Sequence, residues 1–286
     1  MLIGKLVLKL LPIRYYYQAR NIYRKYHKAI YKELSETDLH KILVESMGIK
    51  NGDVIFVHSS IDRLNISASP FKILNILQEV VGSNGTLLFP AWHFTERAEL
   101  YLKKNKVFDV RKAPVALGLL PEIARRSPLA KRSIHPTNSI VAIGKQADEL
   151  LMQHGDSIYP CDELSPFYKM MKLNAKIIGL GVTTEFLSFV HCPEDVMKAD
   201  FPVKTRSDVV FETNVIDHDG NTRIISTLVA DKTIATRNIP GFIKAFVDPE
   251  IARDFHFRGN HFFIADSKEL YKIIERLALK DITIYS

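Results

Sequence analysis

Hydrophobic residues from position 35 onward first recur at helical spacing and then collect in short apolar runs. They repeat at helical spacing between 39 and 47, and Ser35 with Asp38 forms the signature of a capping box at the start of that helix. The following segments predict a strand over 54–60, a helix over 71–81 and a strand over 85–92. Helices and strands that alternate in this way are typical of a mainly parallel sheet whose faces are covered by helices.

The alternation continues through the middle of the chain. Helices are predicted over 117–126, 146–154 and 166–173 and after Pro193, and strands over 139–144 and 175–182.

The pattern changes after about residue 205. Two apolar stretches within 208–230 flank an Asp219–Gly220 turn and predict antiparallel strands, and 260–279 predicts a short strand followed by an amphipathic helix. We therefore predict an α/β fold over 35–286, with a mixed, mainly parallel sheet covered by helices and an antiparallel C-terminal part.

Composition supports one compact domain. Hydrophobic residues make up 47% and charged residues 25% of 286 residues, as in ordinary globular proteins. Lys5 and Lys9 interrupt the only early apolar run, which argues against secretion and against a membrane span. Two cysteines without a CxxC pair argue against a disulfide framework or zinc ribbon and fit a reducing cytoplasm.

The net charge of +7 favours an anionic partner, although a solvated basic surface explains it equally well. Much of this charge lies in residues 1–34, where lysines and arginines are mixed with tyrosines. A helix of this composition fits the inner surface of a membrane, a contact with the protein body or an oligomer contact. No recognised nucleic-acid-binding motif accompanies it, so we expect no nucleic acid partner. We treat 1–34 as a basic, tyrosine-rich helical extension.

Several familiar motifs are absent. The chain has no GxxxxGK[ST] phosphate loop and no GxSxG nucleophile elbow. It also has neither HExxH nor HxE followed by PCxxC, which are motifs of zinc sites, so we expect no metal. The [RQ]xxGx[GA] coenzyme A signature of the commonest acetyltransferase superfamily is missing as well.

Six segments, in order, resemble the aminoglycoside 3-N-acetyltransferase family, also called the antibiotic N-acetyltransferases. They are GDVIFVHSSIDRLN (52–65), VGSNGTLLFP (81–90), the stretch 108–145 that contains RSIHP, LSPFYKM (164–170), IGLGVTTEFLSFVHCPEDV (178–196) and RGNHFFIADSKEL (258–270). The resemblance implies a mixed α/β sandwich with acetyl-CoA in a cleft, and direct acetyl transfer to an amine of an amino sugar.

The resemblance also implies a catalytic pair. His191 matches the histidine of the family's LHxAE segment and Glu194 its carboxylate; three residues apart on a helix, they would share one face. A histidine oriented by a carboxylate is a suitable general base for an amine. Pro193 replaces the family's alanine, and because proline is tolerated only in the first turn of a helix, we expect His191 to lie just before the helix.

Other candidates follow from the same resemblance. His154 is a second catalytic or substrate-binding candidate. His135 is a candidate for substrate or coenzyme contact, and Ser165 is a candidate for substrate contact that is equally placed to cap a helix. The candidates for coenzyme contact are His58, Ser59, Ser60, Arg132 and Ser133. A covalent route through Cys161 or Cys192 is disfavoured because direct transfer suffices.

The acceptor and the reaction class have open alternatives. Sites for polycationic aminoglycosides are expected to be acidic, whereas this chain is basic, which favours an amino sugar bearing phosphates, such as a nucleotide-linked amino sugar for surface polysaccharide. An aminoglycoside resistance enzyme is the first alternative. A Ser/His hydrolase and a non-catalytic membrane-surface protein are the others.

Overall fold

The computed structural model describes residues 29–104, 106–232, 234 and 236–286. The helices are α3 (Glu36–Lys41), α4 (Pro70–Val81), α5 (Ala98–Leu102), α6 (Leu119–Arg125), α7 (Ala147–Leu151), α8 (Pro166–Lys172), α9 (His191–Met197), α10 (Ile239–Phe246) and α11 (Ser267–Ala278). The strands are β1 (Val54–Ser59), β2 (Thr86–Pro90), β3 (Phe108–Asp109), β4 (Lys131–Arg132), β5 (Ile140–Gly144), β6 (Lys176–Leu180), β7 (Phe211–Ile216), β8 (Thr222–Thr227), β9 (Ala252–Phe257) and β10 (Asn260–Asp266).

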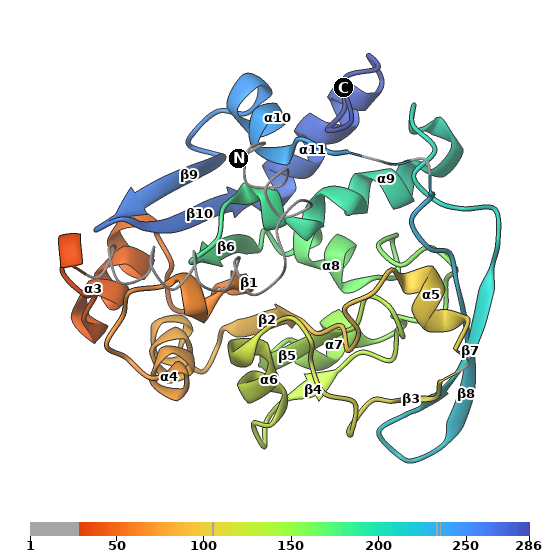
Figure 1. Ribbon diagram of the computed structural model, residues 1–286, viewed down its shortest axis with the longest axis horizontal. Coiled ribbons are helices and arrows are strands. Elements are labelled where there is room, and N and C mark those ends of the chain that lie inside the picture. Colours follow the sequence, from red (N-terminus) through yellow and green to blue (C-terminus); the bar gives the residue numbers. More distant parts are fainter. Residues whose placement is uncertain (1–28, 105, 233, 235) are drawn as a thin grey trace.

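A seven-stranded mixed sheet in the order β4-β5-β2-β1-β6-β10-β9 forms the centre of the molecule (Figure 1). The strands β2, β1 and β6 are parallel to one another, whereas β5 and β4 on one side and β10 and β9 on the other pair antiparallel. The predicted fold class is confirmed, with the parallel part confined to these three central strands. Their carboxyl ends therefore meet at one edge of the sheet.

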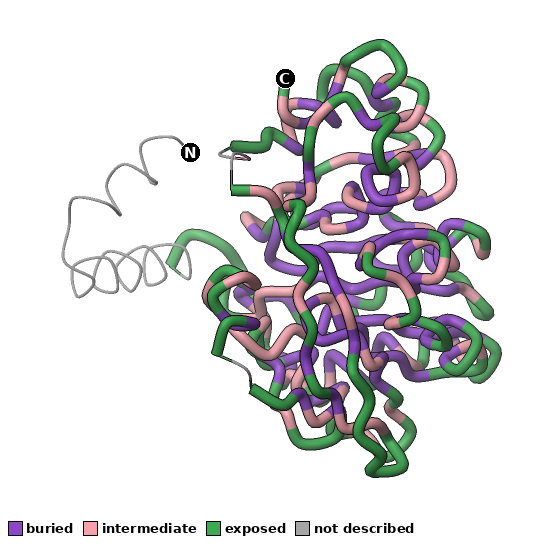
Figure 2. Tube along the Cα trace, turned by 90° about the vertical axis from the view of Figure 1, so that its right-hand side faces the viewer, coloured by how far each residue is buried: buried purple, intermediate pink, exposed green. Residues whose placement is uncertain are grey.

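Helices cover both faces of the sheet because alternate residues of each central strand are apolar on opposite sides. In β1, Val54 and Phe56 belong to the core under α7, α8, α9, α10 and α11, whereas Ile55 and Val57 belong to the core under α3, α4 and α6. Figure 2 shows the buried residues concentrated in the interior of the molecule, with exposed residues on the outer sides. A strand that is buried on both faces has a continuous run of apolar residues in its sequence. For this reason the positions of β1 and β6 could be predicted from the sequence.

Local signals set several helix boundaries as predicted. Ser35 and Asp38 form the capping box at the start of α3, with Asp38 N 3.1 Å from Ser35 Oγ and Ser35 N 2.9 Å from Asp38 Oδ2. Ser69 caps α4, and Pro70 occupies its first position, where a missing N–H costs nothing.

The antiparallel strands predicted within 208–230 are β7 and β8, joined at Asp219–Gly220. Together with β3 they form a separate three-stranded sheet rather than an extension of the main one.

Most of the predicted N-terminal extension, residues 1–28, lies outside the described residues. No helix in the described part of the chain is long and apolar enough to span a bilayer.

Candidate active site

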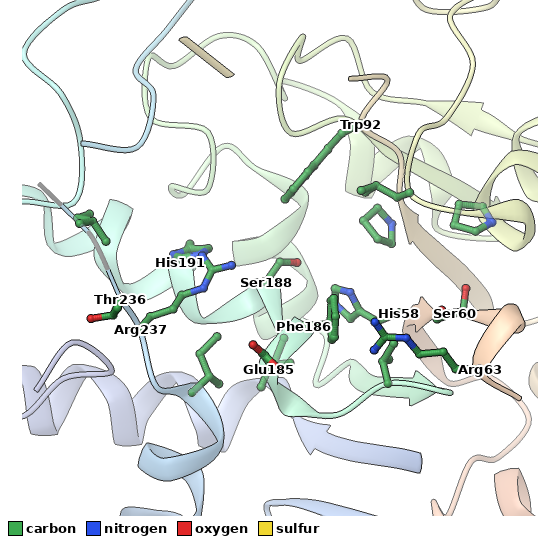
Figure 3. Close-up of a pocket in the computed structure, with 18 residues that line it drawn as sticks. His58, Ser60, Arg63, Trp92, Glu185, Phe186, Ser188, His191, Thr236 and Arg237 are labelled. Atoms are coloured by element: carbon green, nitrogen blue, oxygen red, sulfur yellow. The ribbon is translucent and has the colours of Figure 1, made fainter. Parts of the chain in front are cut away.

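A cavity of about 800 Å³ opens where the three parallel strands end. His58, Ser59 and Ser60 reach it from the end of β1, and Trp92 from just beyond β2. The segment after β6 contributes another part of the wall, from Val182 to His191, and the segment before α10 contributes Thr236 and Arg237 (Figure 3). Crevices at the carboxyl ends of parallel strands are the usual ligand sites of α/β folds, and this volume suits a small organic ligand.

His191 and Glu194 form a hydrogen-bonded pair at one end of the cavity. His191 Nδ1 is 2.8 Å from Glu194 Oε2, and the exposed side-chain fractions are 19% for the histidine and 2% for the glutamate. The expectation that His191 precedes the helix is wrong: α9 begins at His191, so that Pro193 falls in the first turn, where the fold tolerates it. The helical register then brings the two side chains together.

A guanidinium fixes the tautomer of His191. Arg237 Nη1 lies 3.0 Å from His191 Nε2, and because a guanidinium only donates, Nε2 must accept. The proton of the neutral imidazole is then on Nδ1 and is donated to Glu194. His191 and Arg237 both line the cavity, so the contact between them places Nε2 on the cavity side of the pair.

The glutamate is held from behind. Tyr285 donates its hydroxyl to Glu194 Oε1 at 3.0 Å. Burial and the negative charge of Glu194 raise the pKa of this phenol, so that Tyr285 remains a donor at any physiological pH.

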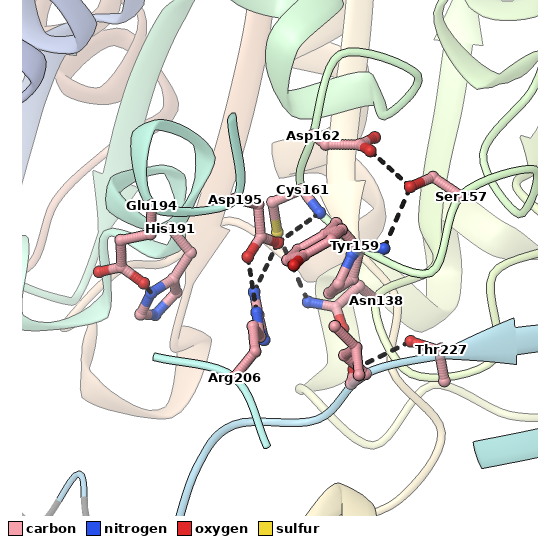
Figure 4. Close-up of polar contacts among 12 residues, drawn as sticks. Asn138, Ser157, Tyr159, Cys161, Asp162, His191, Glu194, Asp195, Arg206 and Thr227 are labelled. Carbon is pink, nitrogen blue, oxygen red and sulfur yellow. Dashed lines mark hydrogen bonds and ion pairs between the residues drawn. The ribbon is translucent and has the colours of Figure 1, made fainter. Parts of the chain in front are cut away.

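The next residue of α9 is also fixed by ionic contacts (Figure 4). Arg206 binds Asp195 with two hydrogen bonds of 2.6 and 2.7 Å, and the backbone N–H of Cys161 donates to Asp195 Oδ2 at 2.8 Å. Asp195 is fully buried, so this bidentate pair anchors α9 to the neighbouring loops.

Four buried polar atoms of residues around the cavity have no partner in the described structure. They are His58 Nε2, Ser59 Oγ, Trp92 Nε1 and Ser188 Oγ, all from residues that line the cavity. An unpaired buried polar group costs about 1–3 kcal/mol, so these four atoms are candidates for contact with a bound ligand. Burial lowers the pKa of His58 to about 3, which leaves its imidazole neutral.

The cavity carries more cationic than anionic side chains. Arg63 and Arg237 line it, and Glu185 is the acidic residue among its described lining residues. Arg63 lies over the ring of Phe186, with 5.4 Å from its guanidinium carbon to the ring centroid.

His154, His135 and Ser133 lie together away from the cavity lining. The two histidine rings stack at 4.8 Å, His154 Nδ1 is 2.8 Å from Ser133 Oγ, and His154 Nε2 is 3.0 Å from the Pro160 carbonyl oxygen. Burial lowers the pKa of His154 to about 3 and that of His135 well below its usual range. Both rings are neutral, and both nitrogens of His154 are already engaged in the fold.

Arg132 and Ser165 also serve the fold. Arg132 donates to the carbonyl oxygens of Ala91 and Ala113 and to Ser139 Oγ, so its guanidinium is occupied inside the protein. Ser165 caps α8 by accepting from the Tyr168 N–H at 3.4 Å.

Burial raises the pKa of Cys161 and of Cys192 well above the usual range, so both stay thiols, which agrees with the sequence argument against a covalent route. Within the described ranges, histidine, cysteine, aspartate and glutamate side chains form no group of three or more placed to hold a metal ion.

The sequence brought His58, Ser59, Ser60, His191 and Glu194 to this region but did not single out several others, among them Arg63, Glu185, Ser188, Trp92, Arg237 and Tyr285. Positional signals were available for Ser188, three positions before His191, and for Trp92, the last residue of the strand predicted over 85–92. Arg237 and Tyr285 had none, because they reach the pair from 46 and 91 residues away in the sequence.

Comparisons with known proteins agree with the fold. Residues 56–278 match the family model described as aminoglycoside 3-N-acetyltransferase. The chain is 28% identical over 174 residues to aminoglycoside N(3)-acetyltransferase VII of Streptomyces paromomycinus, covering 56% of this chain and 59% of that protein. It is 26% identical over 201 residues to aminoglycoside N(3)-acetyltransferase III of Serratia marcescens, covering 65% and 70%. The chain thus spans less than two thirds of the first of these relatives.

Two solved structures share the architecture. Aminoglycoside acetyltransferase AAC(3)-Xa superposes with a TM-score of 0.73 at 20% identity, covering 88% of this chain and 94% of that one. AAC-IIIb in binary complex with CoASH superposes with a TM-score of 0.72 at 22% identity, covering 88% and 98%.

Proposed function

The chain belongs to the aminoglycoside 3-N-acetyltransferase family, and we propose that it transfers an acetyl group from acetyl-CoA to an amine of an amino sugar. The observation that carries this proposal is the His191–Glu194 pair, whose basic nitrogen faces a cavity at the carboxyl ends of the parallel strands. The names of the relatives and the coenzyme bound in a structural neighbour support the same reaction class.

His191 is the general base of this reaction. Acetyl-CoA, when bound, supplies the acetyl group as a thioester. His191 Nε2 accepts a proton from the acceptor nitrogen as that nitrogen bonds to the carbonyl carbon, and the carbon–sulfur bond then breaks. The proton passes from His191 to the departing sulfur, which leaves an amide and the free thiol. Glu194 stabilises the imidazolium that exists between these transfers.

The unpaired donors of the cavity fit the other requirement of acyl transfer. A carbonyl oxygen that gains negative charge needs preorganised donors, and Trp92 Nε1 can only donate, while the Ser188 hydroxyl is free to do so. We assign Ser188 and Trp92 to this oxygen, and His58, Ser59 and Ser60 to the coenzyme. The buried positions of His154, His135, Ser133, Arg132 and Ser165 support structural roles instead.

For the acceptor we propose an amino sugar that bears phosphate, of which a nucleotide-linked amino sugar for surface polysaccharide is the leading candidate. The position of Arg237 beside His191, at the end of the cavity where the acceptor amine reacts, supports an anionic acceptor. An aminoglycoside is the second candidate, because the matched relatives carry that substrate in their names.

We propose 35–286 as the catalytic domain and 1–34 as an extension that contacts the inner face of the membrane. The support for the extension comes from its basic, tyrosine-rich sequence.

Coenzyme A binding separates this proposal from a Ser/His hydrolase. The Ser–His hydrogen bond of the described structure, Ser133 to His154, lies outside the cavity lining. We predict that coenzyme A at about 100 times its Kd stabilises the protein by about 2.7 kcal/mol, measured as a rise in the thermal unfolding midpoint. Desulfo-coenzyme A serves as a control for phosphate contacts, and no shift with either compound would contradict the proposal.

A further inference from the structure

Arg237 occupies the position that the acceptor amine needs. Its Nη1 donates to the lone pair of His191 Nε2 at 3.0 Å, and this lone pair is the one that must receive the amine proton. The guanidinium does not lose its own proton at any physiological pH, so it cannot take part in proton transfer. The base is therefore capped in this structure, and Arg237 has to move away before His191 can act.

Arg237 has no carboxylate partner among the described residues. Arg206, which also lies beside α9, binds Asp195 with two hydrogen bonds, whereas in the described part of the chain no ion pair joins Arg237 to a carboxylate. Figure 3 shows Arg237 beside His191 at one end of the cavity, with Arg63 next to Phe186 farther along it. A guanidinium in this setting is available to an anion that enters the cavity.

The phosphates of the coenzyme are poorly placed to be that anion. Arg237 touches the base and therefore lies at the reacting nitrogen. In acetyl-CoA the whole pantetheine arm separates the thioester from the diphosphate. The anion that reaches Arg237 must belong to the acceptor.

We propose that the acceptor carries a phosphate or carboxylate close to its reacting amine, and that this anion binds Arg237 and draws it off His191 Nε2. This inference rests on the proposed acetyl transfer and adds where the anion of the acceptor lies and what it does to the base. Phosphate and carboxylate both match the paired donors of a guanidinium. A polycationic acceptor brings no such anion and places like charges together at the base, so Arg237 selects against it.

The test compares two amines that differ in one phosphate. Glucosamine 1-phosphate carries its phosphate on the carbon next to the amine-bearing carbon, and glucosamine lacks it; gentamicin represents the polycations. We expect the full-length protein to show a higher kcat/KM for the phosphorylated sugar. Arg237→Ala should reduce the ratio of the two kcat/KM values roughly ten- to hundredfold, the range expected for losing a hydrogen bond to a charged group. Arg237→Lys, which retains the charge, should reduce it less.

Arg63→Ala is the matched control, because it removes one cavity guanidinium that does not touch the base. It should leave the ratio unchanged. An unchanged ratio in Arg237→Ala, an equal loss in Arg63→Ala, or a wild-type preference for glucosamine or gentamicin would overturn the inference while leaving acetyl transfer intact. If none of the three amines is acetylated, the proposed function itself is refuted.

Discussion

Single side chains determine which nitrogen of His191 is basic. Glu194 accepts from Nδ1 and Arg237 donates to Nε2, so the tautomer is fixed from both sides of the ring. Tyr285 in turn fixes the carboxylate through its second oxygen. A ring oriented in this way has its lone pair on Nε2, and once Arg237 leaves that atom the ring has the arrangement that a general base requires.

Ser188 gives a prediction at this scale. Its hydroxyl is buried, unpaired and part of the cavity wall one helical turn before His191. Ser188→Ala should lower kcat about 100-fold with little change in the KM for acetyl-CoA, because a donor to a developing oxyanion acts mainly in the transition state. Steady-state assay of free thiol release measures both constants.

Ser188→Thr is the control, since it retains the hydroxyl and should recover most of the lost rate. If Ser188→Ala changes only the KM, the hydroxyl binds a ligand in its ground state and the assigned role is wrong.

At the scale of helices and strands, the sequence predicted what depends on local pattern. The apolar runs located β1, β2 and β6, and the cap at Ser35 located the start of α3. Strand β9 was not predicted, because Ala252 is the one buried residue of ARDFHF and the strand lies at the edge of the sheet, paired with β10 alone. Its place in the sheet depends on that long-range pairing rather than on local pattern.

Helix α9 shows the same limit at the site. The His-x-x-Glu spacing pointed to the pair, but Pro193 suggested a helix that begins too late to hold it. The short 3₁₀ helix Ser188–Val190 leads directly into α9, so His191 is already helical and proline needs no hydrogen bond there. The contributions of Arg237 and Tyr285 depend on chain segments that only the tertiary fold brings together.

The whole molecule contains several neutral, buried histidines, which makes its stability depend on pH. Burial lowers the pKa of His58 and of His154 to about 3, while an unfolded chain has the ordinary value near 6.5. Below pH 6.5 the unfolded state binds protons that the folded state excludes, so the free energy of unfolding falls as the pH falls toward 3. Each such group contributes a slope of about 1.4 kcal/mol per pH unit within that window.

Urea unfolding at pH 7.0, 6.0 and 5.0 should show this loss of stability. His154→Gln is a suitable control, because glutamine has both an acceptor for Ser133 and a donor for the Pro160 carbonyl but no titratable ring. The free energy of unfolding of His154→Gln should fall less steeply with decreasing pH than that of the wild-type protein, by the contribution of one titrating group, about 1.4 kcal/mol per pH unit. Equal stability of the wild-type protein at all three pH values would contradict the neutral buried state of these histidines.

The architecture as a whole places His191 beside the cavity at the ends of the three parallel strands. The activity of this proton acceptor is directly measurable. Acetyl transfer from acetyl-CoA to a phosphate-bearing amino sugar, followed by mass spectrometry of the product, should be rapid for the wild-type protein. His191→Asn should reduce kcat about 10²- to 10⁴-fold, the usual contribution of a general base, and leave coenzyme A binding unchanged. A His191→Asn variant that turns over at the wild-type rate would show that the His191–Glu194 pair is not the catalytic base.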